Sequence, residues 1–150
     1  MAQKTFIAEQ LTSADVNLYL AGEGGAWTAW TPVVTQDVNV VVTNTRSRFA
    51  RYGRTIHFSL SLVVTGAGTA SGAIFVSLPV TAAASDAIDA TGYFYDNSAN
   101  IFYVGAGANT TTTVGLNGYG LTGLIGTQGF TAGLAVNDVI RIAGTYEAAS

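Results

Sequence analysis

The chain has 150 residues, of which 49% are hydrophobic and 10% charged, and its formal net charge is −3. This length predicts one domain with a substantial core, and the composition is unlike that of disordered chains. The lack of cysteine excludes disulfides and cysteine-bound zinc, and the acidic balance argues against nucleic acid as the main partner.

No basic segment followed by an apolar run opens the chain, and glycine or polar residues interrupt every long apolar stretch. We therefore expect synthesis in a cytoplasm and no insertion into a membrane. The low charge has two interpretations. The surface is covered either by Thr, Ser, Asn and Gly side chains or, in part, by other chains, and the second interpretation favours an oligomer or a larger assembly.

Residues 1–26 differ from the rest because they contain a helical pattern. Thr12 or Ser13 is placed to cap a helix and Gly22 to end it. One apolar face of this helix would present Val16, Tyr19 and Leu20. A helix this short is marginal alone, so we expect residues 1–26 to form a docking arm and residues 27–150 to form the folded domain.

From Trp27 onward the pattern consists of strands and turns. The clearest strand, residues 55–65, has the period of two that is typical of a half-buried strand. Its apolar side carries Ile56, Phe58, Leu60, Leu62 and Val64. Further strands are expected at 27–34, 38–43, 47–52, 73–78, 88–96, 101–105, 110–116 and 138–147.

So many short strands separated by turns predict an all-β protein. We expect a jelly-roll-like antiparallel β-sandwich preceded by a short N-terminal helix or arm. Tight turns are expected at residues 53–54 and 96–100, and residues 118–133 give the weakest pattern. Trp27 and Trp30, at the start of the domain, would either cover the end of the core or form surface platforms.

Candidate catalytic groups are few. The one histidine, His57, lies on the polar side of the 55–65 strand, and no cluster of carboxylates lies near it in the sequence. A serine triad would lack its GxSxG elbow, and the glycine-rich turns lack the lysine of a phosphate loop. We therefore expect no enzymatic activity, no catalytic residues, no metal and no cofactor, and we rank a glycan depolymerase last.

Aromatic residues gather near amides in the region 93–103, which is the combination that binds sugars. The candidate glycan-binding residues are Tyr93, Tyr95, Asn97, Asn100 and Tyr103. Alternatively these rings pack the core. On a strand Tyr93 and Tyr95 share one face and Phe94 takes the other, so at least one of the two faces is expected to be core.

Four arginines lie within nine residues. Arg46, Arg48, Arg51 and Arg54 would either pair with carboxylates of a neighbouring subunit or belong to an ordinary solvated hairpin.

The segment KTFIAEQLTSADVNLYL resembles the short lead segment of minor structural proteins of tailed bacteriophages. The positions that carry this resemblance are Phe6, Leu11, Thr12, Asp15, Val16, Asn17, Tyr19 and Leu20. From WTAWTPVV through RFARYGRTIHFSLSLVVTGAGTASGAIFVSLP to IAGTYEA, the chain is similar to a β-sandwich module of phage tail fibres, minor tail proteins and head decorations. Residues 86–135 match that module only in their general residue pattern and not in specific motifs.

The resemblance implies a trimeric protein on the virion surface, and it supplies no catalytic residues. The arm would dock through Phe6, Leu11, Val16, Tyr19 and Leu20. Because the chain lacks a coiled coil and a shaft repeat, we expect a capsid decoration (cement) protein that stabilises the shell. Its partners would be the major capsid protein or tail and baseplate proteins. The alternative is a tail-tip or tail-fibre module that binds a host surface glycan.

Overall fold

The computed structural model describes residues 26–85, 88–128 and 133–149. The predicted N-terminal helix and its docking residues, Phe6, Leu11, Val16, Tyr19 and Leu20, lie outside the described residues. The described part contains ten strands: β1 (Thr28–Ala29), β2 (Val34–Gln36), β3 (Val38–Val40), β4 (Val42–Tyr52), β5 (Thr55–Val64), β6 (Ile74–Ser77), β7 (Ile88–Asp96), β8 (Ile101–Asn109), β9 (Thr113–Gly118) and β10 (Val139–Glu147).

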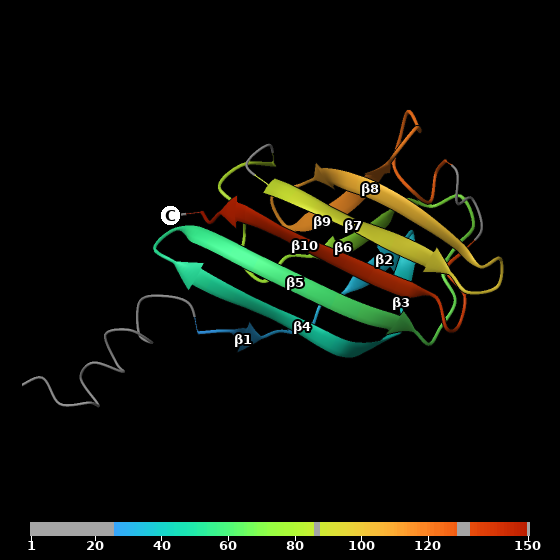
Figure 1. Cartoon of the computed structure of the whole chain (residues 1–150), viewed down its shortest axis with the longest axis horizontal. Helices are drawn as coiled ribbons and strands as arrows, with labels where there is room; N and C mark the ends of the chain where they lie inside the picture. The colour runs from blue at the N-terminus through green and yellow to red at the C-terminus, as the bar shows by residue number, and fades with distance from the viewer. Residues whose placement is uncertain (1–25, 86–87, 129–132, 150) are drawn as a thin grey trace, which may run out of the picture.

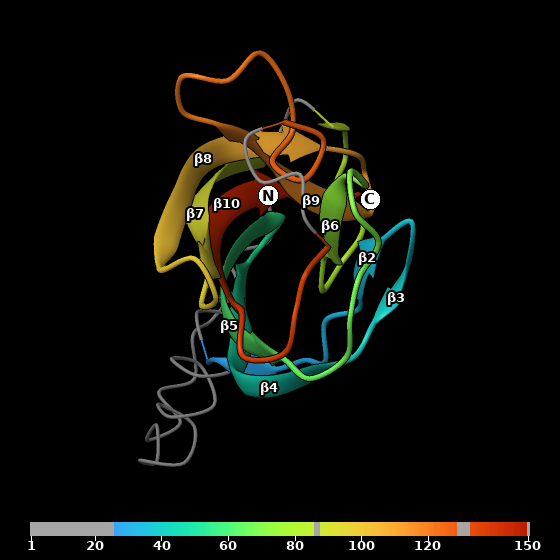
Figure 2. The same cartoon turned by 90° about the vertical axis from the view of Figure 1, so that its right-hand side faces the viewer.

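These strands pair antiparallel into one sheet with the order β1-β4-β5-β10-β7-β8-β9-β6-β2-β3. The sheet curls over, so that β6, β2 and β3 lie behind β5 and β10 in Figure 1 and face them across the interior in Figure 2. The antiparallel, sandwich-like β-fold predicted from the sequence is confirmed. Its two layers are two halves of a single half-barrel sheet.

Alternating apolar side chains fill the inside of the curl. All five apolar residues predicted for one side of β5 are buried, and none of the residues between them is. The rest of the sheet contributes further buried side chains: Val34, Ile74, Val76, Phe94, Val114, Leu116, Ile140 and Ile142. Burying this apolar surface is the main stabilising contribution to the fold.

Glycine permits a close approach of β7 and β10. A Cβ atom at Gly92 would collide with the carbonyl oxygen of Arg141 in β10. In the same pair of strands, a Cβ atom at Gly144 would collide with the carbonyl oxygen of Asp89. Any larger residue at either position would push these strands apart.

Several strand boundaries differ from the prediction. The strand expected at 27–34 is not continuous, because only Thr28–Ala29 and the residues from Val34 onward pair in the sheet. The strand expected at 38–43 is divided at Val41, and β8 runs to Asn109 and not only to Gly105.

The break expected between 38–43 and 47–52 is a bulge within β4, where the register against β5 shifts between Asn44 and Arg46. The strand expected at 110–116 begins only at Thr113. The Thr110 hydroxyl oxygen accepts hydrogen bonds from the backbone N–H groups of Thr112 and Thr113 and so forms a turn.

The two tryptophans take different roles. Trp30 packs edge-on against Phe49 and Phe58, with ring centroids 6.2 and 6.3 Å apart, and so covers the core. Trp27 is 48% exposed, with the guanidinium of Arg48 lying 4.4 Å from its ring centroid. Each of the two predicted interpretations therefore holds for one tryptophan.

Candidate binding face

The outer face consists of the side chains on β4, β5, β10, β7 and β8 that point away from the core. Cross-strand partners share a face, so the pairing register divides it into rows. A row of mostly small residues contains Arg48, Ser59, Ala143, Thr91 and Ala106. The next row contains Arg46, Ser61, Arg141, Tyr93 and Val104. The third row is apolar, with Val63, Val139, Tyr95 and Phe102.

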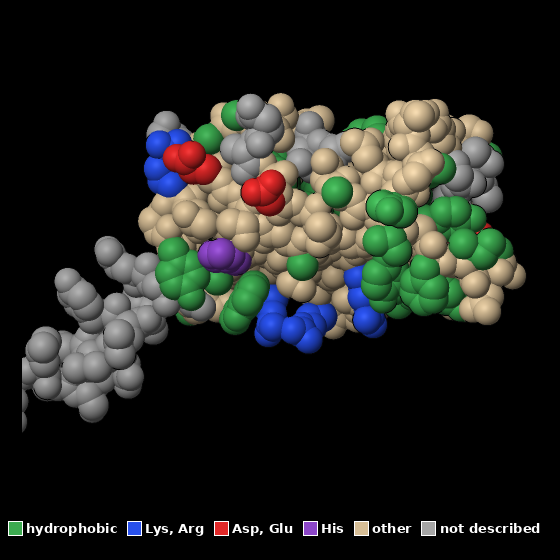
Figure 3. Space-filling model, turned by 45° about the horizontal axis from the view of Figure 1, so that its top comes forward, with side chains coloured by type: hydrophobic (Ala, Val, Ile, Leu, Met, Phe, Trp, Pro, Cys, Tyr) green, Lys and Arg blue, Asp and Glu red, His purple; other side chains and the backbone are tan. Residues whose placement is uncertain are grey.

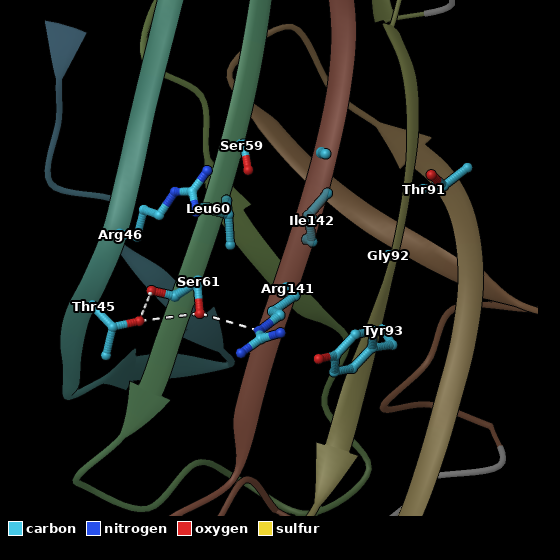
Figure 4. A pocket seen from close by; sticks show the side chains of 11 residues that line it. Thr45, Arg46, Ser59, Leu60, Ser61, Thr91, Gly92, Tyr93, Arg141 and Ile142 are labelled. Atoms are coloured by element: carbon cyan, nitrogen blue, oxygen red, sulfur yellow. Dashed lines mark hydrogen bonds between the residues drawn. The ribbon is translucent and has the colours of Figure 1, made fainter. Parts of the chain in front are cut away.

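Small residues between larger ones leave a hollow of about 540 Å³ in this face. We call it the arginine hollow, and its lining includes Thr45, Arg46, Ser59, Ser61, Tyr93 and Arg141. Figure 4 shows these side chains arriving from four adjacent strands, β4, β5, β10 and β7. The hollow lies over the middle of the sheet, away from its edges.

Hydrogen bonds fix part of the arginine hollow. The Thr45 hydroxyl donates to the carbonyl oxygen of Ser61 at 2.7 Å and lies 3.0 Å from the Ser61 Oγ. Arg141 Nε donates to the same Oγ at 3.3 Å, and the Arg141 guanidinium carbon lies 5.9 Å from the ring centroid of Tyr93. Arg141 is therefore held between a hydroxyl and an aromatic wall, as Figure 4 shows.

Aromatic rings gather at one end of the outer face, and we call them the outer aromatic cluster: the half-buried Tyr93 and Tyr95 and the exposed Phe102. The Phe102 ring centroid lies 5.2 Å from that of Tyr93 and 4.5 Å from that of Tyr95. Phe102 is 58% exposed. Figure 3 shows hydrophobic side chains massed at this end of the molecule and blue arginine side chains along one border.

The other end of the outer face holds a second hollow of about 690 Å³, between Trp27, Tyr52 and His57. His57 is exposed, as expected from its place on the polar side of β5. Its Nδ1 lies 2.9 Å from the hydroxyl of Thr145, and its ring meets that of Tyr52 edge-on at 5.7 Å. These contacts give His57 a packing role on this face.

The β7–β8 hairpin has a fixed shape next to the outer aromatic cluster. An Asp96 carboxylate oxygen accepts hydrogen bonds from the Ser98 hydroxyl at 2.7 Å and the Ala99 N–H at 2.9 Å. The Ser98 hydroxyl bond is the largest cause that lowers the pKa of Asp96 below its ordinary value, followed by the Ala99 bond. The buried carboxylate of Asp138 accepts a further bond from the Asn97 N–H at 3.0 Å.

The structure brings together three of the five candidate glycan-binding residues. Tyr93 and Tyr95 lie side by side on the outer face, and the Tyr95 hydroxyl donates to Asn100 Oδ1 at 2.9 Å. Asn97 lies in the same hairpin turn with an exposed side chain. Tyr103 pairs with the buried Phe94 and packs against the core, on the opposite side of the sheet from the cluster.

The four clustered arginines have different surroundings. Arg54 forms an ion pair with Glu147 of its own chain at 3.1 Å, and the Arg51 side chain donates to the Gly53 carbonyl oxygen at 2.7 Å. Arg48 covers Trp27, and Arg46 extends over β5 into the arginine hollow (Figure 4). Contacts of these residues with another subunit stay a prediction.

Sequence reasoning missed Arg141, Ser61 and Thr45 as members of one site. Arg141 and Ser61 are 80 residues apart in the chain, and only the pairing of β10 with β5 brings them together. A local signal did exist for Phe102, which follows the 96–100 turn and alternates with the inward-facing Tyr103.

Comparison with known proteins adds no relative, because no protein-family model, curated protein or solved structure matches the chain. Within the described residues, no three His, Asp or Glu side chains come close enough to hold a metal ion. The same part of the chain contains no helix that is both long and apolar enough to span a membrane.

Proposed function

We propose that the protein is a non-enzymatic structural protein of the bacteriophage virion, which decorates the assembled capsid and stabilises it. The observation that supports this most is the outer face, a broad sheet surface with exposed rings such as Phe102 and Trp27. Exposed apolar surface of this kind is typical of protein contacts. A protein that binds only the assembled shell stabilises it by its binding free energy.

The start of the described chain supports a role for residues 1–26 as a docking arm. Strand β1 pairs with β4 at one edge of the sheet, and Trp27 before it lies on the outer face. A segment tethered there is attached at the border of that face. Docking through this arm and the outer face together would give a virion protein two points of attachment, and the resemblance to phage virion proteins implies a homotrimer with closed symmetry.

Copy number per particle tests the capsid role. We expect quantitative mass spectrometry of purified virions to find the protein at a level comparable with the major capsid protein. A few copies confined to the tail would contradict the proposal. We also expect that a chain lacking residues 1–25 folds but fails to enter particles, and normal incorporation of that truncated chain would contradict the docking role of the arm.

The outer aromatic cluster favours a second candidate function, a tail-tip or tail-fibre module that binds a host surface glycan. The half-buried rings of Tyr93 and Tyr95, with Asn100 bonded to the Tyr95 hydroxyl, offer a stacking surface with a polar rim. Purified protein should then bind host cells, and Tyr93→Ala should weaken that binding. Tyr119→Ala is the matched control, because Tyr119 is 94% exposed and lies outside the cluster. Absence of cell binding by the unaltered protein would remove this candidate.

A further inference from the structure

The arginine hollow has an arginine on each of the two strands that flank one serine of β5. Arg46 and Arg141 are the two cross-strand partners of Ser61, from β4 and β10. Their backbones are therefore two strand spacings, or about 10 Å, apart. In Figure 4 the Arg46 side chain reaches over β5 toward Ser59, while the Arg141 guanidinium lies beside Ser61 and Tyr93.

Neither guanidinium is neutralised within the described residues, where the ion pair present joins Arg54 to Glu147. Arg141 uses its Nε on Ser61, while the terminal nitrogens of that guanidinium make no hydrogen bond to the described residues. The nearest acidic residue of the outer face, Asp89, is two rows away, opposite Thr145. A chain with a net charge of −3 thus carries a local positive site, and the planar donor fork of a guanidinium matches the geometry of a carboxylate.

The walls and floor of the hollow suit a sugar ring. The hydroxyls of Thr45, Ser59 and Ser61 line it on one side, and the ring of Tyr93 on the other. Hydroxyls can exchange hydrogen bonds with those of a saccharide, and an aromatic ring stacks against the C–H face of a pyranose. The volume of about 540 Å³ falls within the range of small-molecule sites.

A peptide partner fits this place less well. Extended peptides are usually bound through backbone hydrogen bonds at an exposed strand edge. The strands beneath the hollow, β5, β10 and β7, are each paired on both sides within the sheet. Their backbone groups are therefore already used in the sheet, and only side chains are left to contact a ligand.

We propose that the arginine hollow binds a carboxylate-bearing saccharide. Its carboxylate lies between Arg46 and Arg141, its hydroxyls contact Ser59, Ser61 and Thr45, and its ring packs against Tyr93. This proposal rests on the glycan-binding candidate function, and it names the chemical class of that glycan.

Titration calorimetry on the full chain tests the proposal with trigalacturonate and its neutral counterpart, galactotriose. We expect the acidic trisaccharide to bind about tenfold or more tightly than the neutral one, because charge-assisted hydrogen bonds are lost in the neutral ligand. The double variant Arg46→Gln with Arg141→Gln should abolish this preference. Arg51→Gln is the matched control, since it removes the same charge at the β4–β5 turn, outside the hollow.

Circular dichroism establishes that each variant is folded before its affinity is compared. Equal binding of the two trisaccharides, no binding of either, or an equal loss in Arg51→Gln overturns the proposal. A glutamate-rich peptide that binds as tightly as trigalacturonate, with the same dependence on Arg46 and Arg141, also overturns it and identifies a protein contact. Binding of the unaltered protein to host cells is measured separately. Cell binding without a preference for the acidic trisaccharide would overturn this inference and leave the glycan-binding function supported.

Discussion

The two faces of the same five strands differ sharply in what their side chains do. On β5 the inner residues, such as Phe58 and Leu60, are buried in the core, while the outer residues, such as Ser59 and Ser61, are small and polar. On β7 the contrast is between Phe94, which is 1% exposed, and its neighbours Tyr93 and Tyr95, whose half-buried rings pack with the exposed Phe102 on the outer face.

This contrast distinguishes side chains that are required for folding from side chains that indicate binding. Packing a half-barrel interior requires the inner apolar side chains. The chain would fold equally well with Thr, Ser or Lys on the outer face. Folding therefore does not require exposed rings there such as Phe102 and Trp27. Residues of that kind on the outer face are therefore the best guide to binding.

The largest expected effect of a single substitution is on the inner face. Phe94→Ala should lower the free energy of unfolding by about 3–5 kcal/mol, because it leaves a cavity in the core. Tyr95→Ala, one position along the same strand, should cost only about 1–2 kcal/mol, for a lost ring contact and a lost hydrogen bond to Asn100. Urea unfolding measures both values. Equal losses would mean that the outer face is as important to stability as the core.

A buried polar residue should give the second largest effect. The Gln36 amide is fully buried, with its Nε2 donating to the Gly72 carbonyl oxygen at 3.2 Å and its Oε1 accepting from the Leu134 N–H at 2.7 Å. Gln36→Leu should cost about 1–3 kcal/mol, because both backbone groups lose their partner in the interior. The control is Asn39→Leu, which removes an exposed amide from β3. If the two variants unfold at the same urea concentration, the hydrogen bonds from Gln36 to the backbone of Gly72 and Leu134 do not contribute to stability.

Local alternation and turn residues made much of the fold predictable. The two faces of β5, the opposite orientation of Phe94 and Tyr95, and the turn between β7 and β8 all follow from short-range pattern. Short-range alternation and turn residues do not indicate which strands lie next to each other in the sheet. The insertion of β10 between β5 and β7, which places Arg141 beside Ser61, depends on pairing between distant segments. The arginine hollow was therefore not predictable, although the outer aromatic cluster was in part.

A third prediction uses a hydroxyl on the inner face. The Tyr146 hydroxyl donates to the Val80 carbonyl oxygen at 2.7 Å and accepts from the Val80 N–H at 3.1 Å. Burial raises the pKa of Tyr146 from 10.0 to about 12, while the hydrogen bond to Val80 opposes this rise. Between pH 10 and 12 the unfolded chain therefore loses this proton before the folded one does, so stability is full below pH 10 and falls as the pH rises.

Urea unfolding at pH 8 and at pH 11 measures this dependence, and Tyr146→Phe is the control. We expect a smaller loss between these pH values in the variant than in the unaltered chain, because the group that titrates has been removed. At pH 11 only part of the titration is complete, so the effect should be smaller than that of Gln36→Leu. An identical pH dependence in both proteins would show that Tyr146 titrates as in the unfolded chain.

The smallest effect on stability is expected where the proposed effect on binding is large. Phe102→Thr removes an exposed ring from the outer aromatic cluster but leaves a β-branched residue that suits a strand. Its cost should be at most about 1 kcal/mol, the size of the ring contacts with Tyr93 and Tyr95. The same variant should weaken adsorption to host cells if the cluster contacts a glycan. A large loss of stability with unchanged adsorption would instead make Phe102 a structural residue, and exposed rings on this face would no longer indicate a binding site.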